Sequence, residues 1–174
     1  MKIQSLRKKR IRLLKDLICN RYPGICNYIS NLREGTIAED NQVKLLLLDG
    51  EPIAFFKNEE LIPTLYIVKK VGKSALPRVV VDEGAVKHLL NGADVMVPGI
   101  TYVDSFNVGD IVSVWEPKEV TPIIIGKALM SANDIKSLSR GKAIKNLHYA
   151  GDKIWKLMLR IPVSYTHLTL PTKA

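Results

Sequence analysis

The sequence has few of the residues on which catalytic and metal sites depend. It contains only two cysteines and three histidines among 174 residues. Cys19 and Cys26 have no second Cys or His pair at the spacing of a zinc site, so we expect two buried free thiols and neither a metal nor another cofactor. No nucleophile motif, HExxH motif or paired carboxylates accompany His88, His148 or His167, so the sequence predicts no enzyme.

Long apolar runs are also absent. No run approaches the roughly 20 residues that cross a bilayer, and the N-terminal MKIQSLRKKRIRLL returns to charge before a signal-peptide core can form. We therefore expect a cytoplasmic protein with no membrane partner. Hydrophobic residues make up 47% and charged residues 25% of the chain, which is typical of one globular domain or two small ones.

What the sequence does contain is an excess of positive charge. The formal net charge is +9, and residues 1–21 hold eight Lys or Arg against the single acid Asp16, leaving about +2 for the rest of the chain. Such a charge favours an acidic partner, and RNA, DNA and anionic lipid are all compatible with it. A basic patch elsewhere must come from folding, since composition does not supply one.

The basic segment has the pattern of an amphipathic helix that Ser5 can cap. Its apolar positions recur at spacings of about three and four residues and predict one packed face: Leu6, Leu13, Leu14, Leu17 and Ile18. We interpret the cations on the other faces as an RNA or ribosome contact, with a solvated face or a membrane-surface helix as alternatives. These cations are Arg7, Lys8, Arg10 and Lys15.

The next fifty residues predict a mixed domain. Pro23 can open a second helix that Gly35 ends. Asp49-Gly50 between two apolar runs is a strong signal for a hairpin over 43–56, and a third β-rich run covers 61–70. The stretch VGKSALP is typical of a connection between domains, so we place a boundary near residue 75.

Beyond this boundary the pattern is one of short strands broken by glycine turns. A strand over 78–81 precedes a helix over 83–90 that Asp82 caps. Further strands are expected around 94–101, 109–116 and 122–131, followed by a helix that Ser131 opens and a closing segment over 142–159. Many short strands with little helix favour a small closed β-barrel.

Residues 78–156 resemble the PUA domain, and the preceding seventy-odd residues resemble the pre-PUA domain of archaeal proteins and of the eukaryotic malignant T-cell-amplified-sequence family. The resemblance implies an α+β protein with an α/β pre-PUA domain (1–75) and a pseudo-barrel PUA domain (76–160). We assign residues 161–174 to a C-terminal tail outside both domains, because Ser164 to Ala174 resemble a non-native sequence. The motifs are Asp82-Glu83-Gly84, Gly92-Ala93, Pro98-Gly99, Gly109-Asp110, Gly126-Lys127, and Gly151-Asp152 before Trp155.

By this resemblance the RNA site is the glycine loop after the first PUA helix and the strand that follows it. Gly92 and Ala93 present almost no side chain, so a phosphate could approach their main-chain N–H groups. Alternatively, Gly92 only ends the helix, and Val95 and Met96 belong to the core. The loop is Asn91, Gly92, Ala93 and Asp94, and the strand is Val95, Met96, Val97, Pro98 and Gly99.

Cations near this loop are expected to contact phosphates. His148 and Tyr149 could stack on an unpaired base, although packing against Trp155 is an equal alternative. The candidate cations are Lys87, Lys127, Lys142, Lys145 and Lys153, and Arg140 is ranked below these five.

The resemblance implies a translation-associated RNA-binding protein that contacts tRNA or the small ribosomal subunit. In the eukaryotic family a SUI1-like translation factor lies on a separate partner chain, and we expect a monomer when the protein is alone. Two alternatives stay open: a protein-docking adaptor, and an accessory subunit of an RNA-modifying complex.

Overall fold

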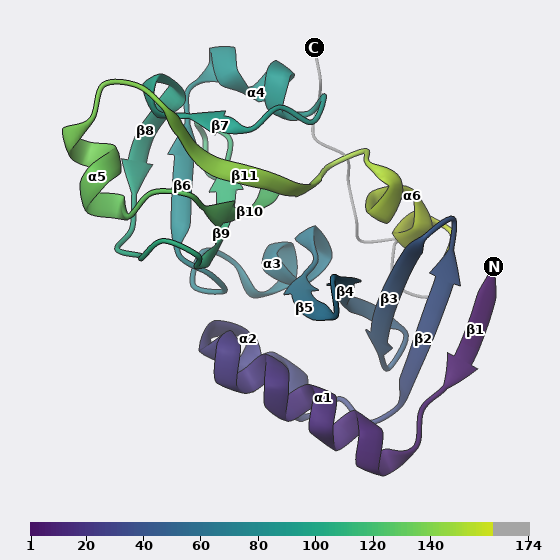
Figure 1. Cartoon of the computed structure of the whole chain (residues 1–174). Helices are drawn as coiled ribbons and strands as arrows, with labels where there is room; N and C mark the ends of the chain where they lie inside the picture. The colour runs from purple at the N-terminus through teal and green to yellow at the C-terminus, as the bar shows by residue number, and fades with distance from the viewer. Residues whose placement is uncertain (162–174) are drawn as a thin grey trace. The chain divides into compact units, whose positions relative to one another are not determined.

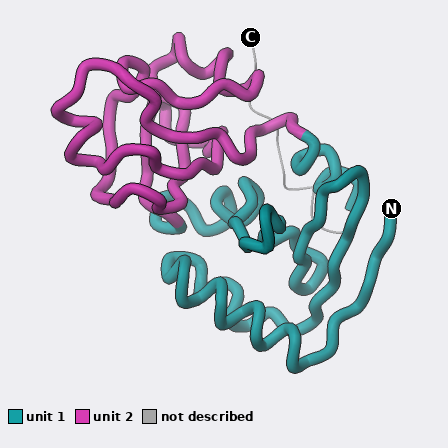
Figure 2. Tube along the Cα trace, viewed as in Figure 1, with its two compact units in different colours: residues 1–75, 153–169 teal, residues 76–152, 170–174 magenta. Residues whose placement is uncertain are grey.

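The computed structural model describes residues 1–161 (Figure 1), and these form two compact units (Figure 2). The first unit comprises Met1–Ala75 and the segment that starts at Lys153, and the second comprises Leu76–Asp152. The division lies where the sequence predicts a boundary. The C-terminal limit of the second unit differs from the predicted limit at residue 160. Helix α6 (Lys153–Leu159) belongs to the first unit, where it contacts β3.

The first unit is built on a five-stranded antiparallel sheet with its strands in chain order. Helices α1 and α2 separate β1 from β2, and each later strand joins the next through a short turn. The predicted hairpin is confirmed, because Asp49 and Gly50 take positive φ angles of 50° and 78°, as a two-residue type I′ turn requires. The strands are β1 (Lys2–Ser5), β2 (Gly35–Asp40), β3 (Val43–Leu48), β4 (Glu51–Lys57) and β5 (Glu60–Pro63).

Helix α1 (Lys8–Arg21) begins two residues later than a Ser5 cap predicts, because the chain first forms β1. Ser5 lies opposite Thr36 in the sheet, and the Leu6 N–H donates to the Gly35 carbonyl at 2.9 Å. A local capping signal is therefore overridden by pairing with a strand about thirty residues away.

The buried face of α1 also differs from the prediction. Ile11, Leu14 and Ile18 are buried, whereas Leu13 and Leu17 are 52% and 53% exposed. The apolar stripe is thus wider than the packed face, and two leucines remain on the side that carries cations.

Helix α2 (Pro23–Ser30) opens at Pro23 as predicted, but Gly35 does not end it. Gly35 begins β2 instead, and a Cβ there would lie 2.6 Å from Cγ1 of Ile11. The glycine is needed because β2 passes close to α1, a contact that the local sequence does not reveal.

The β-rich run expected over 61–70 is a strand only as far as Pro63. Thr64 then accepts a hydrogen bond from the Ile67 N–H and caps α3 (Leu65–Val71). The β-rich residues of this segment are buried in a helix, so tertiary packing outweighs their strand propensity.

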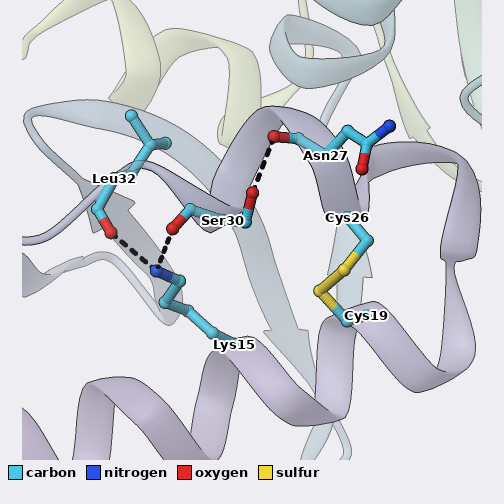
Figure 3. The surroundings of a disulfide bond; sticks show 6 residues. All are labelled: Lys15, Cys19, Cys26, Asn27, Ser30 and Leu32. Carbon is cyan, nitrogen blue, oxygen red and sulfur yellow. Dashed lines mark hydrogen bonds between the residues drawn. A yellow bond between two sulfur atoms is a disulfide. The ribbon is translucent and has the colours of Figure 1, made fainter.

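The prediction of two free thiols is wrong, because Cys19 and Cys26 form a disulfide between α1 and α2 (Figure 3). Both residues are half-buried. Beside them, Lys15 Nζ donates to the carbonyls of Ser30 at 3.0 Å and Leu32 at 2.7 Å. Lys15 therefore satisfies carbonyls at the end of α2, which explains one cation of the basic helix without RNA.

Reducing this disulfide should lower the free energy of unfolding by about 2 to 3 kcal/mol, because the unfolded chain regains the entropy of a short closed loop. Urea unfolding with and without dithiothreitol measures the difference. The Cys19→Ser/Cys26→Ser variant should give equal curves in both buffers, and an identical stability for the oxidised and reduced wild type would contradict the expectation.

Two tyrosines of the first unit have raised pKa values. Burial raises the pKa of Tyr22 to about 12; the nearby Arg21 opposes this shift and Glu60 adds to it. Burial and a hydrogen bond to Glu51 raise the pKa of Tyr28 to about 12. The Tyr28 hydroxyl donates to Glu51 Oε1 at 2.6 Å, and Tyr22 donates to the Leu61 carbonyl at 2.6 Å.

These shifts predict a loss of stability in alkali. An unfolded tyrosine titrates near pH 10, so between pH 10 and about 12 the folded protein holds more protons than the unfolded chain, and the free energy of unfolding falls as the pH rises. Below pH 10 this contribution is fully present. Urea unfolding at several pH values measures it, and Tyr22→Phe/Tyr28→Phe should flatten the dependence.

The second unit contains a six-stranded sheet in the order β7-β11-β10-β9-β6-β8. Strands β6 and β9 are parallel and the other neighbours antiparallel. A single 3₁₀ turn, η1 (Val97–Gly99), joins the edge strands β7 and β8, so the sheet curls into a nearly closed barrel, as predicted. The strands are β6 (Arg78–Val81), β7 (Val95–Met96), β8 (Ile100–Val103), β9 (Ile111–Trp115), β10 (Pro122–Ala128) and β11 (Lys142–Tyr149).

Both predicted helix caps of this unit are confirmed. The Asp82 carboxylate accepts from the Ala85 N–H at 2.9 Å and opens α4 (Glu83–Leu89). The Ser131 hydroxyl accepts from the Asp134 N–H at 3.1 Å and opens α5 (Ala132–Ser137). Within residues 1–161, no helix is long and apolar enough to span a membrane.

Candidate nucleic-acid interface

The glycine loop after α4 is a helix cap. Gly92 has a φ of 97°, and its N–H donates to the Leu89 carbonyl at 3.0 Å. The N–H groups of Asn91 and Ala93 both donate to the His88 carbonyl at 3.1 Å. The helix-ending interpretation of Gly92 is thus confirmed. These N–H groups already donate within the protein, so the expected direct contact with phosphate would have to replace those hydrogen bonds.

Asn146 of β11 fixes this loop in place. Its side-chain amide donates to the carbonyls of Ala93 at 3.0 Å and Leu89 at 3.2 Å, and its main-chain N–H donates to Asp94 Oδ1 at 2.9 Å. Sequence reasoning missed this residue as a partner of the loop. The sequence around Asn146 shows only a polar residue within a predicted strand. This does not indicate which other element the side chain hydrogen-bonds to.

Gly92 also lies against an aromatic ring of the same unit. A Cβ at this position would stand 3.4 Å from Cε1 of Tyr149. Any side chain would therefore meet Tyr149 and also adopt a backbone conformation that favours glycine. A substitution at Gly92 would disturb the local fold together with any RNA contact.

Strand β7 continues from the loop and pairs with β11, where Met96 lies opposite Lys142. Val95 is 1% exposed and belongs to the core, so its expected contact with RNA is wrong. Met96 is 44% exposed, which overturns the core alternative for this residue. Pro98 is exposed, and the Gly99 carbonyl accepts from the Asp82 N–H at 2.9 Å.

Two of the predicted cations stand directly opposite each other. Lys127 of β10 pairs with Lys145 of β11 in the antiparallel ladder. Opposite residues of such a ladder point to the same face, with their Cβ atoms about 5 Å apart. Like charges at this distance repel in the folded protein, and a bound anion would relieve that repulsion. We call these two residues the lysine pair.

The remaining cations are dispersed. Lys142 Nζ lies 3.6 Å from Asp94 Oδ2, so this lysine joins β11 to the glycine loop. Lys87 is exposed on α4, and Arg140 is exposed before β11. Lys153 begins α6 and belongs to the first unit, so it is not part of a site formed by the second unit alone.

The predicted stacking of His148 on a base is wrong. His148 is 0% exposed, and its Nδ1 lies 2.9 Å from Asp152 Oδ2. The same carboxylate oxygen accepts from the Tyr149 N–H at 2.9 Å. His148 and Asp152 thus close the turn after β11, and only the half-buried Tyr149 could offer part of a ring to a ligand.

In the basic helix, Arg7, Lys8 and Arg10 are exposed, as a contact with a polyanion requires. No described group of three or more His, Cys, Asp or Glu side chains within residues 1–161 could hold a metal ion.

A curled sheet of six short strands, with a glycine-ended helix leading into one edge strand, is the architecture of a PUA domain. The PUA domain family matches residues 77–150, and residues 5–71 match a domain of unknown function, DUF1947.

The chain resembles whole proteins over most of its length. An uncharacterised protein of Methanocaldococcus jannaschii is 42% identical over 154 residues, covering 86% of this chain and 93% of the relative. Translation machinery-associated protein 20 of Saccharomyces cerevisiae is 33% identical over 156 residues, covering 83% and 86%. A crystal structure of a Pyrococcus horikoshii protein superposes with a TM-score of 0.77 at 33% identity, covering 90% and 99%.

The chain therefore belongs to the family of PUA proteins with this N-terminal domain, which includes archaeal proteins, translation machinery-associated protein 20 and the malignant T-cell-amplified sequence proteins. The predicted family resemblance is confirmed.

Proposed function

We propose that this protein binds RNA through its second unit and acts in translation by binding, without catalysis. The observation that carries the proposal is the lysine pair, Lys127 and Lys145, on adjacent strands of a PUA domain. Two like charges held opposite each other are unfavourable in the folded protein. A polyanion whose phosphates lie across both strands stabilises them.

The surroundings of the pair suit a structured RNA. Lys142, exposed on the same strand, adds a third positive charge, which Asp94 partly offsets. Met96 offers exposed apolar surface one strand away. Phosphate contacts of this kind position an RNA without reading its sequence. We therefore expect recognition of shape, as in a tRNA or a helix of small-subunit ribosomal RNA.

Translation is the process that the relatives suggest. The yeast relative is a translation machinery-associated protein by name. We place the protein in the cytoplasm, together with a SUI1-like factor on a separate chain. Intracellular proteins of hyperthermophilic archaea can be rich in disulfides. The Pyrococcus horikoshii relative comes from a hyperthermophile. In such an organism the Cys19–Cys26 disulfide is compatible with a cytoplasmic protein.

A salt titration tests the proposal. The full chain is titrated with total tRNA and with small-subunit ribosomal RNA between 0.05 and 0.3 M salt, roughly the range over which phosphate contacts are lost. We expect the logarithm of the affinity to fall linearly and steeply with the logarithm of the salt concentration. Absence of binding to both RNAs at the lowest salt would refute RNA binding.

Protein docking is the second candidate function, and the exposed leucines of α1 favour it. Leu13 and Leu17 lie on the surface beside Arg10, and together with Tyr22 and Phe56 they line a groove of about 470 Å³ in the first unit. An apolar contact responds little to salt. Binding of a partner protein that persists at 0.3 M salt, roughly the top of the same range, would support docking at this surface.

A further inference from the structure

A second concentration of positive charge lies within the first unit. Lys153, Lys156 and Arg160 follow one another at spacings of three and four residues, which places them on one side of α6 and its continuation. All three line a pocket of about 410 Å³ together with the turn between β2 and β3. We call this pocket the α6 groove. Its other lining residues are Asp40, Asn41, Gln42, Val43 and Leu157.

The turn between β2 and β3 contributes two amide side chains, Asn41 and Gln42, to the lining of the groove. Asn41 and Gln42 have φ angles of 47° and 68°, the left-handed region in which glutamine is uncommon. Two consecutive positive φ angles form the turn that suits the twist of a hairpin. Each amide carries two N–H donors and one oxygen acceptor, so the turn offers neutral hydrogen-bonding groups opposite the cations.

The charge of the groove is positive after its internal pairing. Arg160 Nη1 donates to Asp40 Oδ2, and this hydrogen bond is the largest of the effects that hold the pKa of Asp40 below its usual value. Asp40 is thus charged and orients the guanidinium. Within residues 1–161, neither Lys153 nor Lys156 has an ion-pair partner, and both side chains are exposed.

We propose that the α6 groove binds the phosphodiester backbone of an RNA strand and provides a second RNA contact, in the first unit. The inference rests on the proposed RNA-binding function. Two lysines and an oriented guanidinium on one wall, with two amides on the other, are the donors that phosphate oxygens accept from. The volume of the groove exceeds ten times the roughly 30 Å³ that a water molecule occupies, which leaves room for a phosphate and part of its ribose.

An open groove suits a chain that passes through it. The two lysines contribute point charges to a phosphate, and the arginine adds directional N–H donors. We expect these groups to contact phosphates and not the edges of bases. The contact should therefore strengthen the binding of RNAs of many sequences equally, and it should increase the salt dependence of RNA binding.

Lysine footprinting tests the groove directly in the wild-type full chain. Exposed amines are acetylated with and without saturating total tRNA, and the modified lysines are identified by mass spectrometry. We expect tRNA to reduce the acetylation of Lys153 and Lys156 several-fold. Lys57 and Lys73, which are exposed in the same unit and do not line the groove, should react equally in both samples.

A pair of matched variants supplies the second readout. Lys153→Gln/Lys156→Gln should reduce the magnitude of the salt slope by about 1.4 to 1.8 and weaken tRNA binding roughly 25- to 60-fold at about 0.1 M salt, since each lost phosphate contact changes the slope by about 0.7 to 0.9. Lys57→Gln/Lys73→Gln removes the same charge and should leave both quantities close to those of the wild type.

The outcomes separate this inference from the proposed function. If wild-type protein binds tRNA while Lys153 and Lys156 stay reactive, or if both double variants lose the same affinity, the groove contact is refuted and RNA binding by the second unit stands. If wild-type protein binds no tRNA at low salt, both proposals fall.

Discussion

Replacing Gly126 by alanine should lower the free energy of unfolding by about 3 kcal/mol, the upper part of the usual range for overpacking a core. A Cβ at this position would lie 2.3 Å from Cγ2 of Ile144 and 2.7 Å from the main-chain oxygen of Lys145. The side chain of Ile144 is fully buried, and a close-packed interior leaves little room for such a side chain to move. The oxygen belongs to the backbone of β11, so β10 and β11 would have to separate.

Urea unfolding of Gly126→Ala and of the wild type measures this cost. Gly84→Ala is the control, because the nearest atom to its Cβ is Asp82 Oδ1 at 3.6 Å and the residue lies in the first turn of α4. Alanine there should stabilise the protein by roughly 0.5 to 1 kcal/mol. Equal effects of the two substitutions would show that the close approach of β10 and β11 is not what requires glycine.

The glycine also has a consequence for the site. The pairing of β10 with β11 shifts register between Ile125 and Gly126, and such irregularities redirect the side chains that follow. The next residue is Lys127, which lies opposite Lys145. The absence of a side chain at Gly126 thus allows the tight strand contact beside which the two lysines meet.

Features set by neighbouring residues could be predicted from the sequence. The turn at Asp49-Gly50 and the caps Asp82 and Ser131 depend on backbone groups at most a few residues away. Features that depend on how separate elements pack against each other could not. Strand β1 forms by pairing with β2, and Cys19 meets Cys26 only because α1 and α2 lie side by side.

The site follows the same division. The resemblance named the glycine loop and the cations, but it did not predict their contacts within the protein. Three loop N–H groups turned out to bond helix carbonyls, and His148 is buried against Asp152. Lys127 lies opposite Lys145 because of the register between β10 and β11. The hydrophobic pattern of a strand does not predict its register once the strand contains an irregularity.

The register of β10 and β11 brings Lys127 and Lys145 to one place on the surface of the sheet. Lys127→Gln/Lys145→Gln should weaken tRNA binding roughly 25- to 60-fold at about 0.1 M salt and reduce the magnitude of the salt slope by about 1.4 to 1.8, because two phosphate contacts are lost. Titrations of the full chain with total tRNA at several salt concentrations measure both quantities. Urea unfolding of the same variant without RNA checks that it remains folded.

The control removes equal charge from the same unit. Lys118 and Lys136 are exposed, Lys118 in the loop before β10 and Lys136 on α5, and Lys118→Gln/Lys136→Gln should bind tRNA nearly as the wild type does. A nonspecific attraction to net charge predicts the same loss for both double variants. A site at the lysine pair predicts a loss only for Lys127→Gln/Lys145→Gln, which stays folded without RNA. A folding defect would instead lower affinity and stability together.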